Sequence, residues 1–180
     1  LPELIKTDPN LASRLLDVPS ESYLASRIDS DYRPEIVEIK REALLNDLAK
    51  QFGEFWKNIY STLDPKSQTE FSQAMGIRAL RNIALTMMAR QGSTEVFDLA
   101  YQQYQTNDNM TERLGALRVL VWFDAPQASD ALQDFYDRFK NEDLAIDQWF
   151  MTQAAHPRAD QARIEQLVAQ AGLSSAHVNF

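Results

Sequence analysis

The stretch from Gly92 to Pro126 reads GSTEVFDLAYQQYQTNDNMTERLGALRVLVWFDAP, and it decides the fold. Gly92 ends one helical pattern, because glycine takes the left-handed conformation after a helix at little cost. Ser93 and Glu95 open the next helix, with a carboxylate in the first turn where the helix dipole favours it. Thr111 opens another, and Pro126 the one after that. The stretch therefore predicts consecutive helices separated by short turns.

The same spacing continues along the rest of the chain. Helix openings are expected near Ser93, Thr111, Pro126, Leu144 and Asp160, a step of about 15 to 18 residues. Two helices per roughly 33 to 35 residues is the period of helix-hairpin repeats. No run shows the alternation and hairpin signals of strands. We therefore predict an all-α fold, an α-α superhelix of stacked antiparallel helix hairpins that is HEAT- or armadillo-like.

The first third of the chain is expected to be helical but less regular. Asp8 before Pro9 is an N-cap followed by an N1 proline, and it opens a short helix ending near Asp17. Ser20 opens a second short helix, which runs through Ile28. Two longer helices are expected after these, from residue 34 to the Asp-Pro pair at 64–65 and from about residue 67 to 91.

The helix expected from Pro34 carries the longest amphipathic pattern. Its apolar residues recur at the i, i+3, i+4, i+7 spacing of one helix face, which must be buried against something. These residues are Ile36, Ile39, Ala43, Leu44, Leu48, Phe52, Phe55, Trp56 and Ile59. We expect one helical-repeat domain over residues 1–180, with entry helices and the long helix in 1–66 and a hairpin array in 67–180. Leu1 in place of Met and the apolar end at Phe180 suggest a piece cut from a longer protein, truncated within the array.

Composition excludes several classes of function. The chain has 18 Lys and Arg against 26 Asp and Glu, a net charge of −8, and no basic run, which argues against nucleic acid as a partner. The longest apolar stretch, around residues 119–123, is far short of the roughly 20 residues of a membrane span. The absence of cysteine excludes disulfides, thiolate metal sites and a cysteine nucleophile, and fits a cytoplasmic protein.

Candidate catalytic and metal-binding residues are few. His156 and His177 are the two histidines, and their spacing does not match a zinc site, which needs histidines at helical spacing plus a carboxylate. A Ser-His-Asp triad would have to use one of them, so capping or packing is the favoured role. Glu142, Asp143 and Asp147 could form a carboxylate cluster for acid–base chemistry, but they open a helix and suit its dipole.

Two further patterns are interpreted as structural. The segment 107–111, NDNMT, loosely resembles a calcium loop, but Glu112 and Gly115 are misplaced for an EF-hand, so a turn with an N-cap is favoured. Aromatic residues recur at helical spacing and are expected in the core between helices rather than in a ligand site. They are Tyr101, Tyr104, Trp122, Phe123, Phe135, Tyr136, Phe139, Trp149 and Phe150. We predict no catalytic, cofactor-binding or metal-binding residue in this chain.

Several runs resemble the C-terminal helical domain of bacterial aminopeptidase N. The longest are NMTERLGAL at Asn109–Leu117 and IDQWFMTQA at Ile146–Ala154. RALRN at Arg78–Asn82 and VPS at Val18–Ser20 also fit, in the family's order and at compatible spacing. The resemblance covers nearly the whole chain.

This resemblance implies a part of a zinc metallopeptidase that removes N-terminal residues from peptides. The family's H-E-x-x-H zinc motif and its G-A-M-E-N motif belong to a catalytic domain, and neither occurs here. The implied role is therefore non-catalytic: the array packs on the catalytic domain of its own parent chain, walls the active-site cavity and restricts the access of peptide substrates. Zinc would belong to the parent enzyme, and this fragment would hold no cofactor.

Two other interpretations remain open. A free-standing helical-repeat adaptor would bind peptides or proteins on its concave face. It predicts polar capping helices at both ends, which residues 1–5 and 178–180 do not provide. An enzyme in its own right would need a site that the sequence does not display. The aminopeptidase interpretation instead predicts a docking face that leaves apolar surface exposed in the isolated chain.

Overall fold

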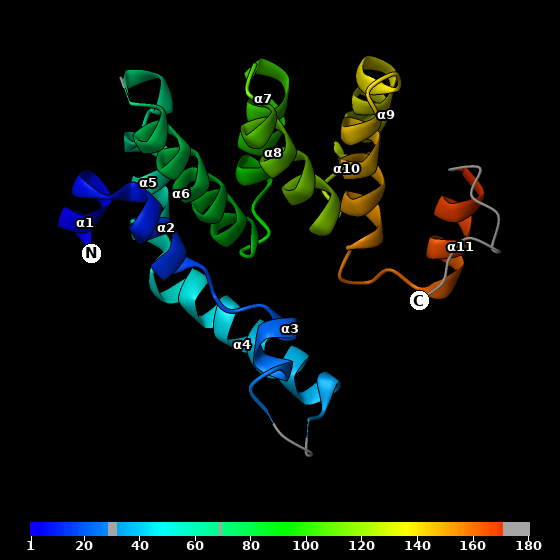
Figure 1. The fold of residues 1–180 in the computed structure, drawn as a ribbon, viewed down its shortest axis with the longest axis horizontal. Helices are drawn as coiled ribbons and strands as arrows, with labels where there is room; N and C mark the ends of the chain where they lie inside the picture. The colour runs from blue at the N-terminus through cyan, green and yellow to red at the C-terminus, as the bar shows by residue number, and fades with distance from the viewer. Residues whose placement is uncertain (29–31, 69, 171–180) are drawn as a thin grey trace. The chain divides into compact units, whose positions relative to one another are not determined.

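The computed structural model describes residues 1–28, 32–68 and 70–170, and every element in these ranges is a helix (Figure 1). The prediction of an all-helical chain is confirmed for this part. The chain divides into two compact units, Leu1–Val96 and Phe97–Phe180.

The first unit is built around one central helix, α6. Its elements are α1 (Pro2–Thr7), α2 (Pro9–Leu16), α3 (Glu21–Ala25), α4 (Pro34–Gln51), α5 (Gly53–Thr62), the short 3-10 helix η1 (Pro65–Ser67) and α6 (Phe71–Ala89). Helices α2 and α5 both pack against α6. The core contains Ala12, Trp56, Ile59, Ile77, Leu80, Ala84, Leu85 and Met88, all at most 5% exposed. Asp8 caps α2 as predicted, its carboxylate accepting from the Leu11 N–H at 3.0 Å.

The crossing of α2 over α6 depends on a glycine. A Cβ at Gly76 would lie 2.5 Å from the backbone nitrogen of Asn10 and 2.6 Å from the carbonyl carbon of Pro9. The Asn10 side-chain amide also donates to the Ser72 carbonyl at 2.8 Å. The absence of a side chain at Gly76 therefore lets the two backbones approach closely.

Two arginines of this unit make polar contacts with neighbouring helices. Arg81 donates to the carbonyls of Tyr60 and Leu63, at 2.6 and 2.8 Å, at the C-terminal end of α5. These are carbonyls that a helix leaves without an internal partner. Arg90, just after α6, forms an ion pair of 2.8 Å with Glu42 of α4. Both contacts fix the angle at which one helix meets the next.

The predicted single helix from residue 34 to 63 is wrong. The chain leaves helical geometry at Phe52, with φ −112° and ψ 29°, and the two helices α4 and α5 result. Because the axis changes there, one apolar face cannot stay buried along both helices. Trp56 and Ile59 of α5 are 3% exposed, whereas the other end of the predicted face is open to solvent. Its exposed members are Ile36 at 47%, Ile39 at 65%, Leu44 at 49% and Phe52 at 48%.

The second unit contains the regular helix hairpins. The first helix of these hairpins, α7, begins at Thr94, shortly before the boundary between the units at Val96. The helices are α7 (Thr94–Thr106), α8 (Met110–Trp122), α9 (Ala128–Phe139), α10 (Asp143–Ala154) and α11 (Gln161–Gln170). Alternate helices begin 33 or 34 residues apart, which confirms the predicted hairpin period. Each predicted opening lies within two residues of the observed one.

Candidate functional site

Polar contacts between successive hairpins of the second unit follow one register. The Tyr104 hydroxyl donates to the Asp134 carboxylate at 2.6 Å, and Trp122 Nε1 donates to the Thr152 carbonyl at 3.0 Å. Arg118 donates to the side-chain carbonyl of Gln148 at 2.9 Å. Each of these pairs is separated by 30 residues in the sequence. The contacts therefore link α7 to α9 and stack α8 on α10.

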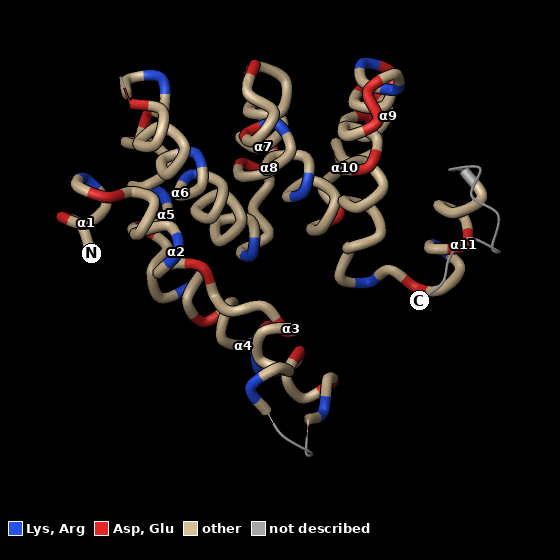
Figure 2. Tube along the Cα trace, in the orientation of Figure 1, with Lys and Arg blue, Asp and Glu red and all other residues tan. Residues whose placement is uncertain are grey.

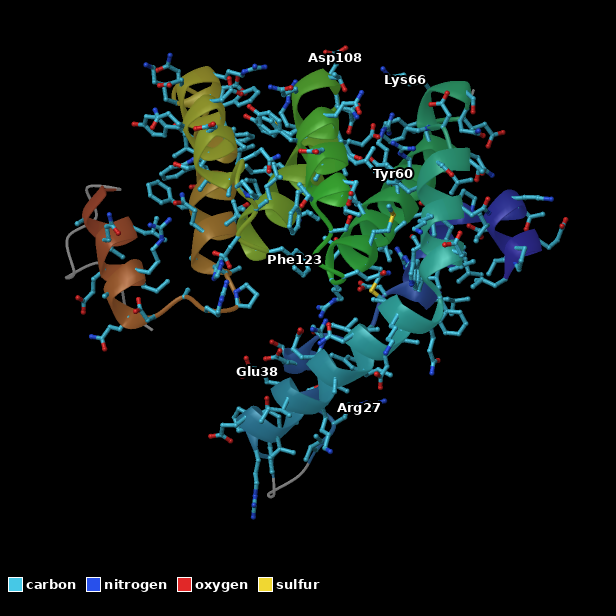
Figure 3. All side chains as sticks on the ribbon, turned by 180° about the vertical axis from the view of Figure 1, so that it is seen from behind. Arg27, Glu38, Tyr60, Lys66, Asp108 and Phe123 are labelled. Atoms are coloured by element: carbon cyan, nitrogen blue, oxygen red, sulfur yellow. The ribbon has the colours of Figure 1, made fainter. Side chains whose placement is uncertain are left out.

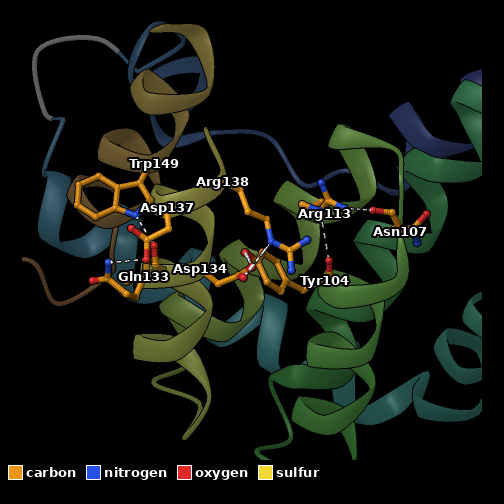
Figure 4. A network of polar contacts seen from close by, with 9 residues as sticks. Tyr104, Asn107, Arg113, Gln133, Asp134, Asp137, Arg138 and Trp149 are labelled. Atoms are coloured by element: carbon orange, nitrogen blue, oxygen red, sulfur yellow. Dashed lines mark hydrogen bonds and ion pairs between the residues drawn. The ribbon is translucent and has the colours of Figure 1, made fainter. Parts of the chain in front are cut away.

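The most connected of these contacts centres on Tyr104 (Figure 4). Asp134 accepts from the Tyr104 hydroxyl and also from Arg138 Nε, the latter at 2.9 Å. The Tyr104 carbonyl accepts from Arg113 of α8, which also donates to the carbonyl of Asn107. One network thus joins α7, α8 and α9.

The electrostatics of this network hold the Tyr104 hydroxyl in its protonated form. Burial raises the pKa of Tyr104 well above its usual range, and the hydrogen bond to Asp134 and the charge of that carboxylate raise it further. The ring is 1% exposed. A buried hydroxyl with a raised pKa that donates to a carboxylate is suited to holding helices together, and it does not present a reactive oxygen to a substrate.

The predicted structural role of His156 agrees with its contacts. Its Nδ1 accepts from the Arg158 backbone N–H at 2.9 Å, so the proton of the neutral ring lies on Nε2, which faces Asp124 Oδ1 at 3.2 Å. Asp124 lies in the turn after α8 with φ 50°, a left-handed conformation that aspartate tolerates better than most residues. Both ring nitrogens are therefore engaged between the α8–α9 turn and the end of α10. His177 lies outside the described residues.

The other candidate ligands do not converge. Glu142, Asp143 and Asp147 are exposed along the first turns of α10. The Asn109 side chain accepts from the Thr111 N–H at 3.0 Å and caps α8, as expected for a turn with an N-cap, and Glu112 is buried in α8. Across residues 1–28, 32–68 and 70–170, no three His, Cys, Asp or Glu side chains are placed to hold a metal ion.

The predicted aromatic set lies mainly between helices. Phe135 is 0% and Trp149 5% exposed, and the Phe135 and Phe139 rings are 4.7 Å apart. Trp149 contacts the rings of Tyr136 and Phe150 at 5.3 and 4.9 Å. Tyr136, at 36%, is the most open ring of the set. The expectation of an inter-helix core is confirmed for the buried rings Tyr104, Phe135 and Trp149, whereas the other rings of the set are partly exposed.

Sequence reasoning missed the residues that bind one hairpin to the next. Tyr104 was named there only as a member of the aromatic set, and neither Asp134 nor Arg118 was singled out. The recurring separation of 30 residues between a donor and an acceptor would have been the available signal. It differs from the 33- or 34-residue step between helix starts, because stacked residues need not occupy equivalent positions in their helices.

None of the described helices combines the length and the low polarity needed to cross a lipid bilayer.

Comparison with known proteins places these helices in a family. Residues 3–176 match the family described as a domain of unknown function, DUF3458_C, with ARM repeats. The chain is 31% identical over 156 residues to aminopeptidase N of Escherichia coli strain K12, an alignment that covers 86% of this chain. It is 26% identical over 165 residues to aminopeptidase N of Caulobacter vibrioides, covering 90% of this chain. Each alignment covers 18% of the relative, so the chain spans less than a fifth of the length of these proteins.

A solved structure supports the same fold. Legionella pneumophila aminopeptidase A, crystallised in complex with aspartic acid, superimposes with a TM-score of 0.74 at 23% identity. The superposition covers 93% of this chain and 20% of that one. The predicted array of helical repeats is therefore confirmed at the level of the fold. The chain belongs to the DUF3458_C family of ARM-repeat domains and matches the C-terminal part of bacterial aminopeptidase N.

Proposed function

We propose that this chain is the non-catalytic helical part of an aminopeptidase N-like zinc metallopeptidase, where it walls the active-site cavity and restricts the access of peptides. The observation that carries the proposal is the alignment with aminopeptidase N, which runs along 86% of this chain but covers only 18% of the relative. The relative therefore has most of its length, and room for a catalytic domain, outside the matched part.

The chemistry of the described side chains supports a structural role. Several polar side chains of the hairpins pair with one another, as in the pairs of Tyr104 with Asp134 and Arg118 with Gln148. The ring nitrogens of His156 are both engaged, and the described residues do not fit a zinc ion. In this proposal the zinc ligands would lie in another part of the parent, where the metal would supply Lewis-acid chemistry.

A wall of stacked hairpins would select substrates by size. Each hairpin contacts the next through buried rings and through hydrogen bonds of fixed register, which makes such an array stiff over neighbouring repeats. A stiff wall leaves a narrow entrance, which a short or unfolded peptide passes and a folded protein does not. Selection then comes from the dimensions of the entrance rather than from any one residue.

The test uses the full-length parent enzyme and a series of peptides that differ only in length. Loosening the hairpin contacts with the double substitution Tyr104→Phe and Trp122→Phe should raise kcat/KM for long peptides while leaving the value for a dipeptide substrate unchanged. Lys66→Gln, at an exposed residue (Figure 3), is the control and should leave the whole series unchanged. An equal effect of the double substitution on short and long peptides would contradict the proposed wall.

The parent reading frame provides a second and simpler test. An H-E-x-x-H motif upstream of Leu1, with a later glutamate ligand, supports the metallopeptidase proposal. An upstream sequence without a zinc motif would overturn it and would favour a helical-repeat adaptor.

A further inference from the structure

Met151 is the most exposed methionine of the chain, and its sulfur is open to oxidants. All five methionines are among the described residues. Met151 is 58% and Met75 50% exposed, whereas Met87 and Met88 are 3% and 5% exposed. Met110 lies between these extremes. Because a peroxide oxidises the thioether sulfurs that it can reach, Met151 and Met75 are the two residues most open to this chemistry.

The Met151 sulfur takes part in a chain of contacts between α8 and α10. Arg118 of α8 donates to Gln148 Oε1 at 2.9 Å. The same Gln148 side chain donates through Nε2 to Met151 Sδ at 3.8 Å. We call these three residues the Arg118–Gln148–Met151 link. Trp122 of α8 donates to the Thr152 carbonyl, one residue further along α10, so the link lies where the two helices are held together.

Met75 provides an internal comparison. It is nearly as exposed as Met151 but lies on α6 in the first unit. Among the residues that the structure describes, no hydrogen bond is made to the Met75 sulfur. Met75 therefore offers a peroxide the same thioether without a neighbouring donor that would bind the product.

Oxidation would change the Met151 sulfur from a weak acceptor into a strong one. A thioether sulfur accepts hydrogen bonds only weakly. A sulfoxide is polar, and its oxygen carries a partial negative charge that attracts an N–H. The Gln148 amide already faces this sulfur. Since the methionine side chain is unbranched and flexible, the new oxygen can meet the amide by rotation of the side chain.

The neighbours of Met151 on the helix surface leave Gln148 as the donor. Residues three and four positions apart are neighbours on a helix, which here are Asp147, Gln148, Ala154 and Ala155. The two alanines have no polar side-chain atom, and an ionised aspartate only accepts hydrogen bonds. From Gln148 to its end, α10 carries no Lys, Arg, Asp or Glu (Figure 2). No cation of α10 therefore competes for the new oxygen.

The effect would reach Arg118 through the same amide. An amide that donates its N–H to a stronger acceptor is polarised, and its carbonyl oxygen becomes a better acceptor in turn. Gln148 holds Arg118 through that oxygen. A stronger contact at Met151 thus strengthens the contact that joins α10 to α8.

We propose that Met151 is an oxidation site for peroxides and that its sulfoxide tightens the contact between α8 and α10. A lone pair of the sulfur attacks one oxygen of hydrogen peroxide, the S–O bond forms and the O–O bond breaks. The proton of the transferred O–H passes to the departing hydroxide, which leaves as water. The sulfur is oxidised and the peroxide is reduced by the same pair of electrons. The oxidation is independent of the proposed function, because it needs only the three side chains of the link.

Peptide mapping by mass spectrometry tests the site in the full-length parent. After treatment with hydrogen peroxide, the sulfoxides of Met151 and Met75 should form at least about tenfold faster than that of Met88, because the Met88 side chain is buried. Met151 oxidised no faster than Met88 would overturn the proposal.

Hydrogen exchange of the same samples tests the tightened contact. In the oxidised parent, the amides of α8 and α10 should exchange about two- to threefold more slowly than in the untreated parent. Met151→Leu should abolish this slowing, whereas Met75→Leu should keep it. Each variant is compared with its own untreated form, which separates the effect of Met151 from oxidation elsewhere. Exchange that is unchanged or faster after oxidation of Met151 would contradict the tightened contact.

The variant Gln148→Glu tests the donor. Glutamate keeps an oxygen that accepts from Arg118 but has no N–H for the sulfoxide. Oxidation of this variant should therefore no longer slow exchange in α8 and α10. Because its treated and untreated forms are compared with each other, a change in basal stability does not affect the result. Slowing that persists in Gln148→Glu would refute the role of the link.

Discussion

The buried hydroxyl of Tyr104 offers the sharpest test at the scale of a single residue. Tyr104→Phe keeps the ring, which is 1% exposed, and removes its 2.6 Å hydrogen bond to Asp134. Since the lost bond is made to a charged group that keeps its pairing with Arg138, we expect the free energy of unfolding to fall by about 1 to 2 kcal/mol. Urea unfolding followed by circular dichroism measures the change.

The matched control for this substitution is Tyr136→Phe. Tyr136 is 36% exposed and packs its ring against Trp149, a contact that phenylalanine keeps. Removing the Tyr136 hydroxyl should change the free energy of unfolding by less than about 0.5 kcal/mol. Equal losses for the two substitutions would mean that the Tyr104 hydrogen bond does not stabilise the stacked hairpins.

The same tyrosine predicts a dependence of stability on alkaline pH. Burial raises the pKa of Tyr104 in the folded state above its ordinary value of 10.0. The folded state then keeps a proton that the unfolded state releases, so this contribution is fully present below about pH 10 and is lost as pH rises further. Between pH 9 and 11, the free energy of unfolding should therefore fall more steeply in the native chain than in Tyr104→Phe. Parallel profiles would show that the pKa is not raised.

At the scale of helices, Gly76 predicts an effect opposite to ordinary helix propensity. Glycine to alanine inside a helix usually stabilises it by roughly 0.5 to 1 kcal/mol. Here a Cβ would lie 2.5 Å from the Asn10 backbone, so α2 must move away from α6. We expect Gly76→Ala to lower the free energy of unfolding by about 1 to 3 kcal/mol, as measured by thermal or urea unfolding.

Gly53→Ala is the control for that crossing. Its Cβ would lie 3.3 Å from Nε2 of Gln91, the far end of a flexible side chain that donates to the Ala49 carbonyl at 3.2 Å, so a shift of a few tenths of an ångström accommodates it. Little or no destabilisation is expected. If Gly76→Ala proves as mild as this control, close approach of the backbones does not determine how α2 packs on α6.

The comparison of prediction with structure is also clearest for helices. Caps and breakers act within a few residues of the chain, and so the openings near Ser93, Thr111 and Leu144 were predicted to within one residue. The break at Phe52 was not, because the apolar spacing continues through it and no proline interrupts the pattern. Gly53, a weak helix former, begins α5 directly after the break and was the signal available in the sequence.

The candidate site also contains some contacts that the sequence could predict and others that it could not. The N-cap role of the segment around Asn109 could be predicted, because the acceptor and the N–H that it binds are two residues apart. The pairing of Tyr104 with Asp134 could not, since it depends on which hairpin stacks on which and in what register. The exposure of Ile36 and Ile39 was also missed, because a helical pattern shows that a face is apolar but does not show how far along the helix the core extends.

At the scale of the whole chain, the question is whether the two compact units unfold together. The sequence led us to expect one helical-repeat domain over residues 1–180, and that expectation stays a prediction. The free energy of unfolding of a repeat protein is approximately the sum of the stability of each repeat and of the interfaces between adjacent repeats. A destabilising substitution therefore weakens most strongly the repeats next to it. Leu1–Val96 has its own core along α6, and Phe97–Phe180 has its own around Phe135.

Phe135→Ala should therefore weaken the two units unequally. Phe135 is 0% exposed, and its truncation should remove about 3 to 5 kcal/mol from the packing around α9. Hydrogen exchange followed by mass spectrometry should show faster exchange in α8, α9 and α10, with the α6 amides close to their native rates. A reciprocal substitution in the first core, Leu80→Ala, should reverse the pattern. If either substitution speeds hydrogen exchange equally in α6 and in α8 to α10, the chain unfolds as one cooperative unit. That is the outcome that a single domain requires.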